Sequence, residues 1–304
     1  MVHTLIQMFA LIGLGLAWSW FNPSKLDDGV IRKVMTDVVY YIFLPALVFK
    51  VLWQAEIGLD SVKIATAAII AVVSGLFLSW FVCKRCRSNP KVTGAVLLAA
   101  AFPNATYLGY PVLTNTLGEW AGSVAIQFDL FACTPILLTV GILLASHYGG
   151  SQKKPHPLQL LIRVPPLWAA VIATSLNLAG VQPIGGIIDL LGIMGSAVVP
   201  IMVFAIGLAL KQGFYELRHL PTVIPVIVIQ LFIMPLIVLG SSLLMGMSHD
   251  LRMAVVLEGA MPSMALGVVL CDRYGLNTGL YAAAVTATTL LSLITLPLWY
   301  GWLA

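Results

Sequence analysis

The sequence contains very little charge. Its 304 residues include 16 Lys and Arg and 12 Asp and Glu, together 9% of the chain, whereas 60% of the chain is hydrophobic. A soluble domain carries about 25% charged residues, so this chain has too few to coat a globule of its size. The composition therefore excludes a soluble enzyme, a nucleic-acid-binding protein and a disordered protein.

Cysteine is also scarce, with four residues. Cys83 and Cys86 form a CxxC pair among basic residues, but no second Cys or His pair follows nearby to complete a zinc site. The sequence has no P-loop, no nucleophile elbow and no metal-ligand spacing. It therefore predicts no enzymatic activity, no metal site and no cofactor.

Long apolar stretches, in contrast, are abundant. They fall at 3–21, 34–53, 62–83, 92–115, 120–146, 158–180, 184–210, 220–246, 251–271 and 278–302. A helix needs about 20 apolar residues to cross the bilayer core, so these stretches predict ten membrane-spanning helices. The start of the chain lacks the basic segment of a signal peptide, so we expect 3–21 to remain as the first span.

The basic residues predict how these spans are oriented. The linkers after the odd-numbered spans hold thirteen Lys and Arg, whereas the linkers after spans 2, 4, 6 and 8 hold only Lys63 and Arg252. Short basic linkers stay in the cytoplasm. We therefore expect a multi-pass protein in the lipid of the cell membrane (inner or plasma), with both termini outside the cytoplasm.

Two short motifs recur in the two halves of the chain. The segment 44–49 (LPALVF) matches 199–204 (VPIMVF) at an offset of 155 residues. The segment 102–104 (FPN) matches 261–263 (MPS) at an offset of 159 residues. Two proline-centred matches at nearly one offset predict a duplicated unit of five helices.

Five spans per half is an odd number, so the second copy must lie upside down in the membrane. This predicts one membrane domain, 1–304, with inverted repeats at about 1–147 and 156–304. Inverted repeats of this kind are typical of secondary transporters.

The fourth and ninth spans carry signals for broken helices. Span 4 contains Pro103, Gly109 and Pro111, and span 9 contains Pro262 with glycines on both sides. A proline leaves the carbonyl four residues earlier without its helical donor, which for Pro103 is the carbonyl of Ala99. A free carbonyl in hydrocarbon must find another partner, so both helices are expected to break and line a polar cavity.

We expect the two breaks to meet near the membrane midplane, with the N-termini of half-helices pointing into one cavity. The residues expected to bind a substrate there are Pro103, Asn104, Thr106, Tyr107, Gly109, Pro111, Pro262 and Ser263. Asn104 and Thr106, a bound ion, a substrate or water could satisfy the freed carbonyls. Neither break contains Arg or Lys, so an anion would be held mainly by helix ends and amides.

Two carboxylates stand deep in apolar spans. Asp129 stands about ten residues into span 5 and Glu258 about eight residues into span 9, or ~15 and ~12 Å deep at 1.5 Å per residue. An ionisable residue at such a depth is usually functional. Asp129 and Glu258 are therefore the candidate groups for coupling transport to protons.

Several motifs resemble the auxin efflux carrier family. They are Pro103-Asn104 with Leu108-Gly109-Tyr110-Pro111, Leu117-Gly118-Glu119, Ala260-Met261-Pro262-Ser263, Arg273-Tyr274-Gly275-Leu276, Thr288-Thr289-Leu290-Leu291-Ser292, Leu296-Pro297-Leu298 and Phe43-Leu44-Pro45-Ala46-Leu47. That family includes plant PIN-type auxin transporters and bacterial permeases for malate or malonate. The resemblance implies a ten-helix inverted-repeat fold, shared with bile acid–sodium symporters, in which broken helices 4 and 9 cross. It also implies elevator-like transport of organic anions by a homodimer.

The sequence thus favours an all-α secondary transporter for a small organic anion, such as a carboxylate, coupled to a proton or a sodium ion. A cation–proton antiporter that uses Asp129 is an alternative, because a buried Asp beside a broken helix suits that chemistry. A membrane receptor or scaffold that transports nothing is the third class, and it would need no polar break. The sequence leaves the anion and the direction of transport open.

Overall fold

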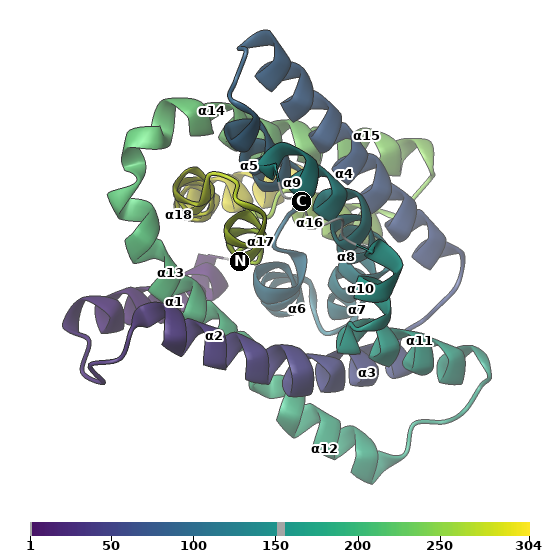
Figure 1. The fold of residues 1–304 in the computed structure, drawn as a ribbon. Helices are drawn as coiled ribbons and strands as arrows, with labels where there is room; N and C mark the ends of the chain where they lie inside the picture. Colours follow the sequence, from purple (N-terminus) through teal and green to yellow (C-terminus); the bar gives the residue numbers. More distant parts are fainter. Residues whose placement is uncertain (1, 151–155) are drawn as a thin grey trace.

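The computed structural model describes residues 2–150 and 156–304 and is all-helical in these ranges (Figure 1). The helical segments of the first half are α1 (Val2–Phe21), α2 (Asp28–Val38), η1 (Val39–Phe43), α3 (Leu44–Gln54), α4 (Leu59–Arg85), α5 (Pro90–Ala101), η2 (Ala105–Gly109), α6 (Tyr110–Leu117), α7 (Trp120–Phe128), η3 (Asp129–Cys133), α8 (Thr134–Ile136), η4 (Leu137–Gly141) and α9 (Ile142–Gly149). Those of the second half are α10 (Pro157–Ile162), α11 (Pro165–Leu178), α12 (Gly185–Ser196), α13 (Val198–Tyr215), η5 (Leu217–His219), α14 (Leu220–Val228), η6 (Ile229–Ile233), α15 (Met234–Leu244), α16 (His249–Gly259), α17 (Gly267–Tyr274) and α18 (Thr278–Leu303).

Within the described ranges, seven helical stretches are long and apolar enough to cross a membrane. They correspond to seven of the ten predicted spans, and they identify a multi-pass membrane protein. The other three predicted spans, 92–115, 158–180 and 251–271, are each divided between shorter helices in the structure. These pairs are α5 with α6, α10 with α11, and α16 with α17, so the total of ten spans stays a prediction.

Prolines explain most of the wide helical turns. Pro45, Pro111, Pro135 and Pro235 each stand two residues after a five-residue π-helical segment, namely η1, η2, η3 and η6. A proline ring clashes with the carbonyl four residues before it, and a wider turn moves that carbonyl away without ending the helix. Two of these turns, η2 and η3, hold Gly109 and Asp129, so the prolines shape the region in which the sequence predicts a site.

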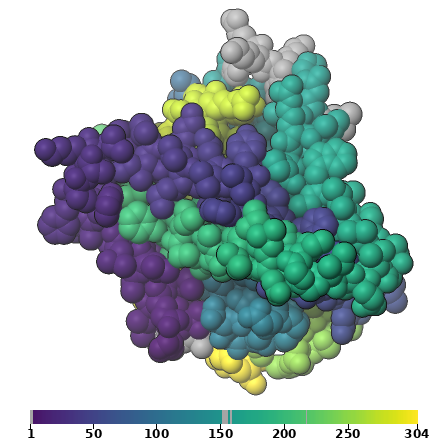
Figure 2. All heavy atoms as spheres, turned by 90° about the horizontal axis from the view of Figure 1, so that it is seen from below, coloured from purple at the N-terminus to yellow at the C-terminus, as the bar shows by residue number. Residues whose placement is uncertain are grey.

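By their main packing contacts the helices fall into two bodies, which also touch each other where α13 packs against α18. In the first body, α1 lies along α13 and α3 lies along α11 and α12, around two small apolar clusters. The second body, built from α4 to α9 and α14 to α18, surrounds the largest apolar cluster. Figure 1 shows α1, α2, α3, α11 and α12 along one side of the molecule, and Figure 2 shows the purple and green segments of this first body across that face.

Two glycines bring α1 and α13 into very close contact. A Cβ atom added to Gly15 would collide with the carbonyl oxygen of Phe204, and one added to Gly207 would collide with the carbonyl oxygen of Ile12. Small residues allow the backbones of membrane helices to approach in this way, where side-chain packing replaces the hydrophobic effect. A larger residue at either position would push α1 and α13 apart.

Candidate functional site

Two short segments, one between α5 and η2 and the other between α16 and α17, meet in the second body. The chain between α5 and η2 runs antiparallel to the chain between α16 and α17, with Pro103 paired with Ser263. The backbone N–H of Asn104 donates to the carbonyl of Pro262 at 2.8 Å. These residues are buried, so the pairing satisfies backbone groups that neither helix could satisfy alone.

The carbonyl freed by Pro103 has a partner from the other segment. The hydroxyl of Ser263 donates to the carbonyl oxygen of Ala99 at 2.6 Å. The sequence offered Asn104 and Thr106, among others, for this role, and the structure assigns it to Ser263. The side chains of Asn104 and Thr106 are therefore available for other contacts.

Side chains from neighbouring spans hold the second segment. The amide nitrogen of Gln230, on η6, donates to the carbonyl of Met261 at 2.9 Å. The hydroxyl of Tyr281, on α18, donates to the carbonyl of Met264, also at 2.9 Å. Sequence reasoning missed both residues, although a glutamine in the middle of an apolar span is a usable signal, because such a group needs a partner.

Asp129 lies beside the antiparallel pairing of Pro103 and Ser263, which we call the crossing, and it binds two threonines. It is 9% exposed, and its two carboxylate oxygens accept hydrogen bonds from the hydroxyls of Thr106 and Thr134, the latter at 2.7 Å. A cavity of about 50 Å³ opens here, lined by Asp129, both threonines, Asn104 and Tyr107 among others. None of its lining residues, all of them within the described part of the chain, is Lys, Arg or His.

Asn104 presents its side chain to this cavity. It is 4% exposed, and its backbone carbonyl accepts from the N–H groups of Leu108 and Gly109 at 3.3 and 3.0 Å, which starts η2. Its side-chain amide has no hydrogen-bond partner among residues 2–150 and 156–304, and it can both donate and accept. This amide is the free polar group best placed to meet a small ligand.

The structure divides the eight predicted binding residues into two sets. Pro103, Asn104, Thr106 and Tyr107 line the small cavity, whereas Gly109, Pro111, Pro262 and Ser263 do not. Pro262 and Ser263 act through the crossing contacts described above, and Pro111 lies at the start of α6.

Glu258 lies apart from the cavity. It is fully buried in the last turn of α16, and neither carboxylate oxygen has a hydrogen-bond partner among the described residues. It abuts Gly109, since a Cβ atom at position 109 would collide with both carboxylate oxygens. The two candidate coupling residues thus have different surroundings: Asp129 faces the cavity, and Glu258 faces the backbone of η2.

Replacing Gly109 tests the contact with Glu258. Overpacking a filled interior costs about 1–3 kcal/mol, so Gly109→Ala should lower the melting temperature of the purified protein in detergent. Adding Glu258→Ala to Gly109→Ala removes the colliding carboxylate and should restore part of that loss. Gly13→Ala is the matched control, because nothing lies within 4 Å of a Cβ atom added there. A melting temperature for Gly109→Ala equal to that of Gly13→Ala would contradict this packing.

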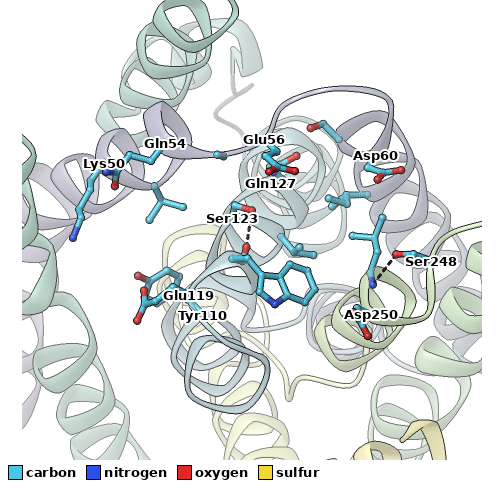
Figure 3. A pocket seen from close by; sticks show the side chains of 17 residues that line it. Lys50, Gln54, Glu56, Asp60, Tyr110, Glu119, Ser123, Gln127, Ser248 and Asp250 are labelled. Atoms are coloured by element: carbon cyan, nitrogen blue, oxygen red, sulfur yellow. Dashed lines mark hydrogen bonds between the residues drawn. The ribbon is translucent and has the colours of Figure 1, made fainter. Parts of the chain in front are cut away.

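A larger cavity opens between the two bodies at the end of the molecule that carries Glu119 (Figure 3). Its volume is about 640 Å³. Its charged lining residues are Lys50 and four carboxylates, those of Glu56, Asp60, Glu119 and Asp250. Gln127 also lines it, although it is only 1% exposed, and its side-chain oxygen has no partner among the described residues. Sequence reasoning did not find this vestibule, because its residues come from helix ends that are far apart in the chain.

Comparison with known proteins identifies the family. Residues 1–300 match the family described as "Membrane transport protein". The chain belongs to this family. The match confirms the resemblance to the auxin efflux carriers, which are the same family, and it establishes the chain as a membrane transporter.

Relatives in this family have similar lengths. An "Uncharacterized transporter" of Methanothermobacter thermautotrophicus is 30% identical over 301 residues, covering 98% of this chain and 96% of the relative. "Uncharacterized transporter YfdV" of Escherichia coli K12 is 26% identical, covering 88% and 87%. A Rhizobium meliloti protein named "Putative malonate transporter" is 27% identical, covering 95% and 92%. The names of all three refer to transport.

Proposed function

We propose that this protein is a secondary transporter that moves a small organic anion, such as a carboxylate, across the cell membrane. The observation that carries the proposal is the crossing at Pro103 and Ser263, because it places Asn104 and Asp129 at one small cavity inside a membrane protein. The name of the relative from Rhizobium meliloti supports a small carboxylate as the substrate class.

We further propose ten spans in two inverted five-helix repeats, about 1–147 and 156–304. The packing of the first body is reciprocal, since α1 of the first half lies along α13 of the second, and α11 of the second half lies along α3 of the first. In the proposed repeats, α1 and α11 belong to the first span of each half, and α3 and α13 belong to the second. The first span of each half therefore packs against the second span of the other half. A twofold axis in the membrane plane generates this exchange, and the antiparallel crossing has the same symmetry.

We propose an elevator-type alternating-access mechanism, which the division into two bodies supports. Asn104, Thr106 and Asp129 belong to the second body, whereas Tyr40 and Leu44, from η1 and α3, close the cavity from the first. We propose that the second body slides past the first and exposes the cavity to each side of the membrane in turn. The vestibule lies along the same boundary between the bodies.

Asp129 is the residue that we propose couples transport to protons. It supplies the carboxylate of the cavity, where no cationic side chain among the described lining residues offsets it. A proton on Asp129 removes a negative charge that would repel an anion a few ångströms away. Proton binding and anion binding would therefore favour each other.

A cation–proton antiporter is the second candidate, and the same observation favours it. A cavity with one carboxylate and no cationic lining residue also suits a cation that exchanges with the proton of Asp129. The two candidates differ in what moves. An antiporter moves protons when a cation gradient is imposed and takes up no organic acid.

The charge distribution predicts the topology. We expect Glu119 and both termini outside the cytoplasm, and the basic segments 84–87 and 153–154 inside, with 153–154 outside the described residues. Single cysteines are placed at positions 119 and 153 in a background without native cysteines. The cysteine at 119 should react with an impermeant reagent in intact cells, and the cysteine at 153 should react only after the cells are permeabilised. Labelling of position 153 in intact cells by an impermeant reagent would overturn this orientation.

Uptake by proteoliposomes tests the proposed function. Liposomes with the purified protein should take up radiolabelled malonate, or another small acid in a competition panel, in a saturable manner, while empty liposomes should not. Uptake no faster than that of empty liposomes for every acid in the panel would refute anion transport.

A further inference from the structure

A second pocket opens on the molecule away from the acidic vestibule, between α2 and α13. Its volume is about 260 Å³, and its charged lining residues are Arg32, Lys211 and Asp28. These helices are neighbours in the first body (Figure 1). This pocket has two cationic side chains and one carboxylate, whereas the vestibule has more carboxylates than cations.

Arg32 is the cation of this pocket that no carboxylate holds. Lys211 donates to the carbonyl of Ser19 at 2.7 Å and forms an ion pair with Asp28 at 3.3 Å. Asp27 uses its carboxylate to cap α2, where it accepts from backbone N–H groups. Among residues 2–150 and 156–304, no carboxylate forms an ion pair with the guanidinium of Arg32, although Asp27 and Asp28 are near enough to attract it.

Arg32 also lines a second, smaller cavity. Together with Ala209 it lines both the 260 Å³ pocket and an inner cavity of about 40 Å³. That inner cavity shares Tyr107, Ala265 and Leu266 with the cavity of Asp129. The three cavities therefore form a row from the surface to the crossing, with Arg32 at the first junction and Tyr107 at the second.

We propose that Arg32 is an anion-binding site, at which the carboxylate of a small organic anion is held on its way to the crossing. This inference rests on the proposed transport of organic anions and adds the residue that recognises the charge on this side of the membrane. The guanidinium offers several donors in a plane that matches a carboxylate. Arg32 does not line the cavity of Asp129, so it would hold the anion before that cavity and not in it.

The opposite charge of the vestibule means that an anion should bind more readily from the Arg32 end of the molecule than from the vestibule end. At the other end of the molecule the vestibule is lined by four carboxylates and one cation, Lys50, so its net negative charge opposes the approach of an anion. Charges around a cleft raise or lower the local concentration of a charged ligand, and salt weakens the effect. Binding through the Arg32 route should therefore weaken as the salt concentration rises.

The test compares two neighbouring cations on α2. Binding of radiolabelled malonate to the purified, full-length protein in detergent is measured for Arg32→Gln, Arg32→Lys and Lys33→Gln. Losing one charge-assisted hydrogen bond to a carboxylate should weaken binding about tenfold or more in Arg32→Gln. Arg32→Lys should bind with intermediate affinity and keep the salt dependence. Lys33 is exposed and lines none of the three cavities, so Lys33→Gln should stay within about twofold of the wild type.

The outcomes separate this inference from the function on which it rests. Wild-type binding by Arg32→Gln, at a wild-type melting temperature, overturns the Arg32 site and leaves anion transport in place. Equal weakening in Arg32→Gln and Lys33→Gln also overturns the site, because it shows a general effect of surface charge. A wild-type protein that neither binds malonate nor transports any acid of the panel refutes the proposed function itself.

Discussion

Asp129→Asn should still exchange substrate across the membrane but lose all accumulation driven by a pH gradient. The amide keeps the shape of the carboxyl group and can still bond to Thr106 and Thr134, but it cannot bind and release a proton. Exchange needs only the binding site and its movement, whereas accumulation needs the coupled proton. Counterflow and pH-driven uptake of radiolabelled malonate in the same proteoliposome preparation measure the two separately.

Asp189→Asn is the matched control for this experiment, since Asp189 is an exposed carboxylate on α12. It should accumulate substrate as the wild type does. Glu258→Gln tests the second carboxylate, which faces Gly109 and lies outside the cavity. If Asp129→Asn and Glu258→Gln both accumulate substrate like the parent, neither residue couples, and transport is uniport or is driven by another ion such as sodium.

Asn104→Ala should lose most substrate binding while the protein still folds. The side-chain amide of Asn104 faces the cavity and has no protein partner among the described residues, so its removal breaks no internal hydrogen bond. Its backbone contacts, with Pro262 and with the start of η2, do not depend on the side chain. A hydrogen bond to a charged ligand contributes about 1.5–3 kcal/mol, or roughly tenfold or more in affinity.

Thermal unfolding and malonate binding, measured on the same purified sample, check this expectation. Asn115→Ala is the control, because Asn115 lies on α6, eleven residues after Asn104, and its side chain donates to the carbonyl of Pro111 at 2.7 Å. Asn104→Ala should weaken binding at an unchanged melting temperature, and Asn115→Ala should not weaken it. Unchanged malonate affinity in Asn104→Ala would show that the amide does not contact the substrate.

The prolines made much of this architecture predictable. A proline inside an apolar stretch must disturb the helix wherever tertiary packing places it, so Pro103, Pro111 and Pro262 pointed to the region of the crossing. The composition and the length of the apolar stretches likewise predicted a membrane protein, because both follow from the thickness of the bilayer.

Contacts between distant segments could not be predicted in the same way. The hydroxyl of Ser263 satisfies the carbonyl of Ala99, and this follows only once the two segments lie antiparallel. Their depth in the membrane did not distinguish Asp129 from Glu258, because the sequence does not tell which distant residues each carboxylate meets. In the structure the two carboxylates differ in their neighbours, since Asp129 lines the small cavity and Glu258 contacts Gly109.

The position of Arg32 beside two cavities could not be predicted from the sequence either. In the sequence Arg32 contributed only to the count of basic linker residues that predicted the topology. Its place at the junction of two cavities depends on how α2 packs against α13. The acidic vestibule, lined by helix ends from both bodies, has the same origin in tertiary packing.

The most direct test of proton-coupled anion transport records substrate and proton movement together. Proteoliposomes with the wild-type protein and a trapped pH indicator receive radiolabelled malonate, and a panel of other small acids in turn, without an imposed cation gradient. We expect saturable uptake of at least one acid, with protons entering in parallel. In Asp129→Asn we expect the proton signal to be lost while substrate exchange remains. Proton movement that follows an imposed sodium or potassium gradient, with no uptake of any acid, would contradict anion transport and establish the antiporter.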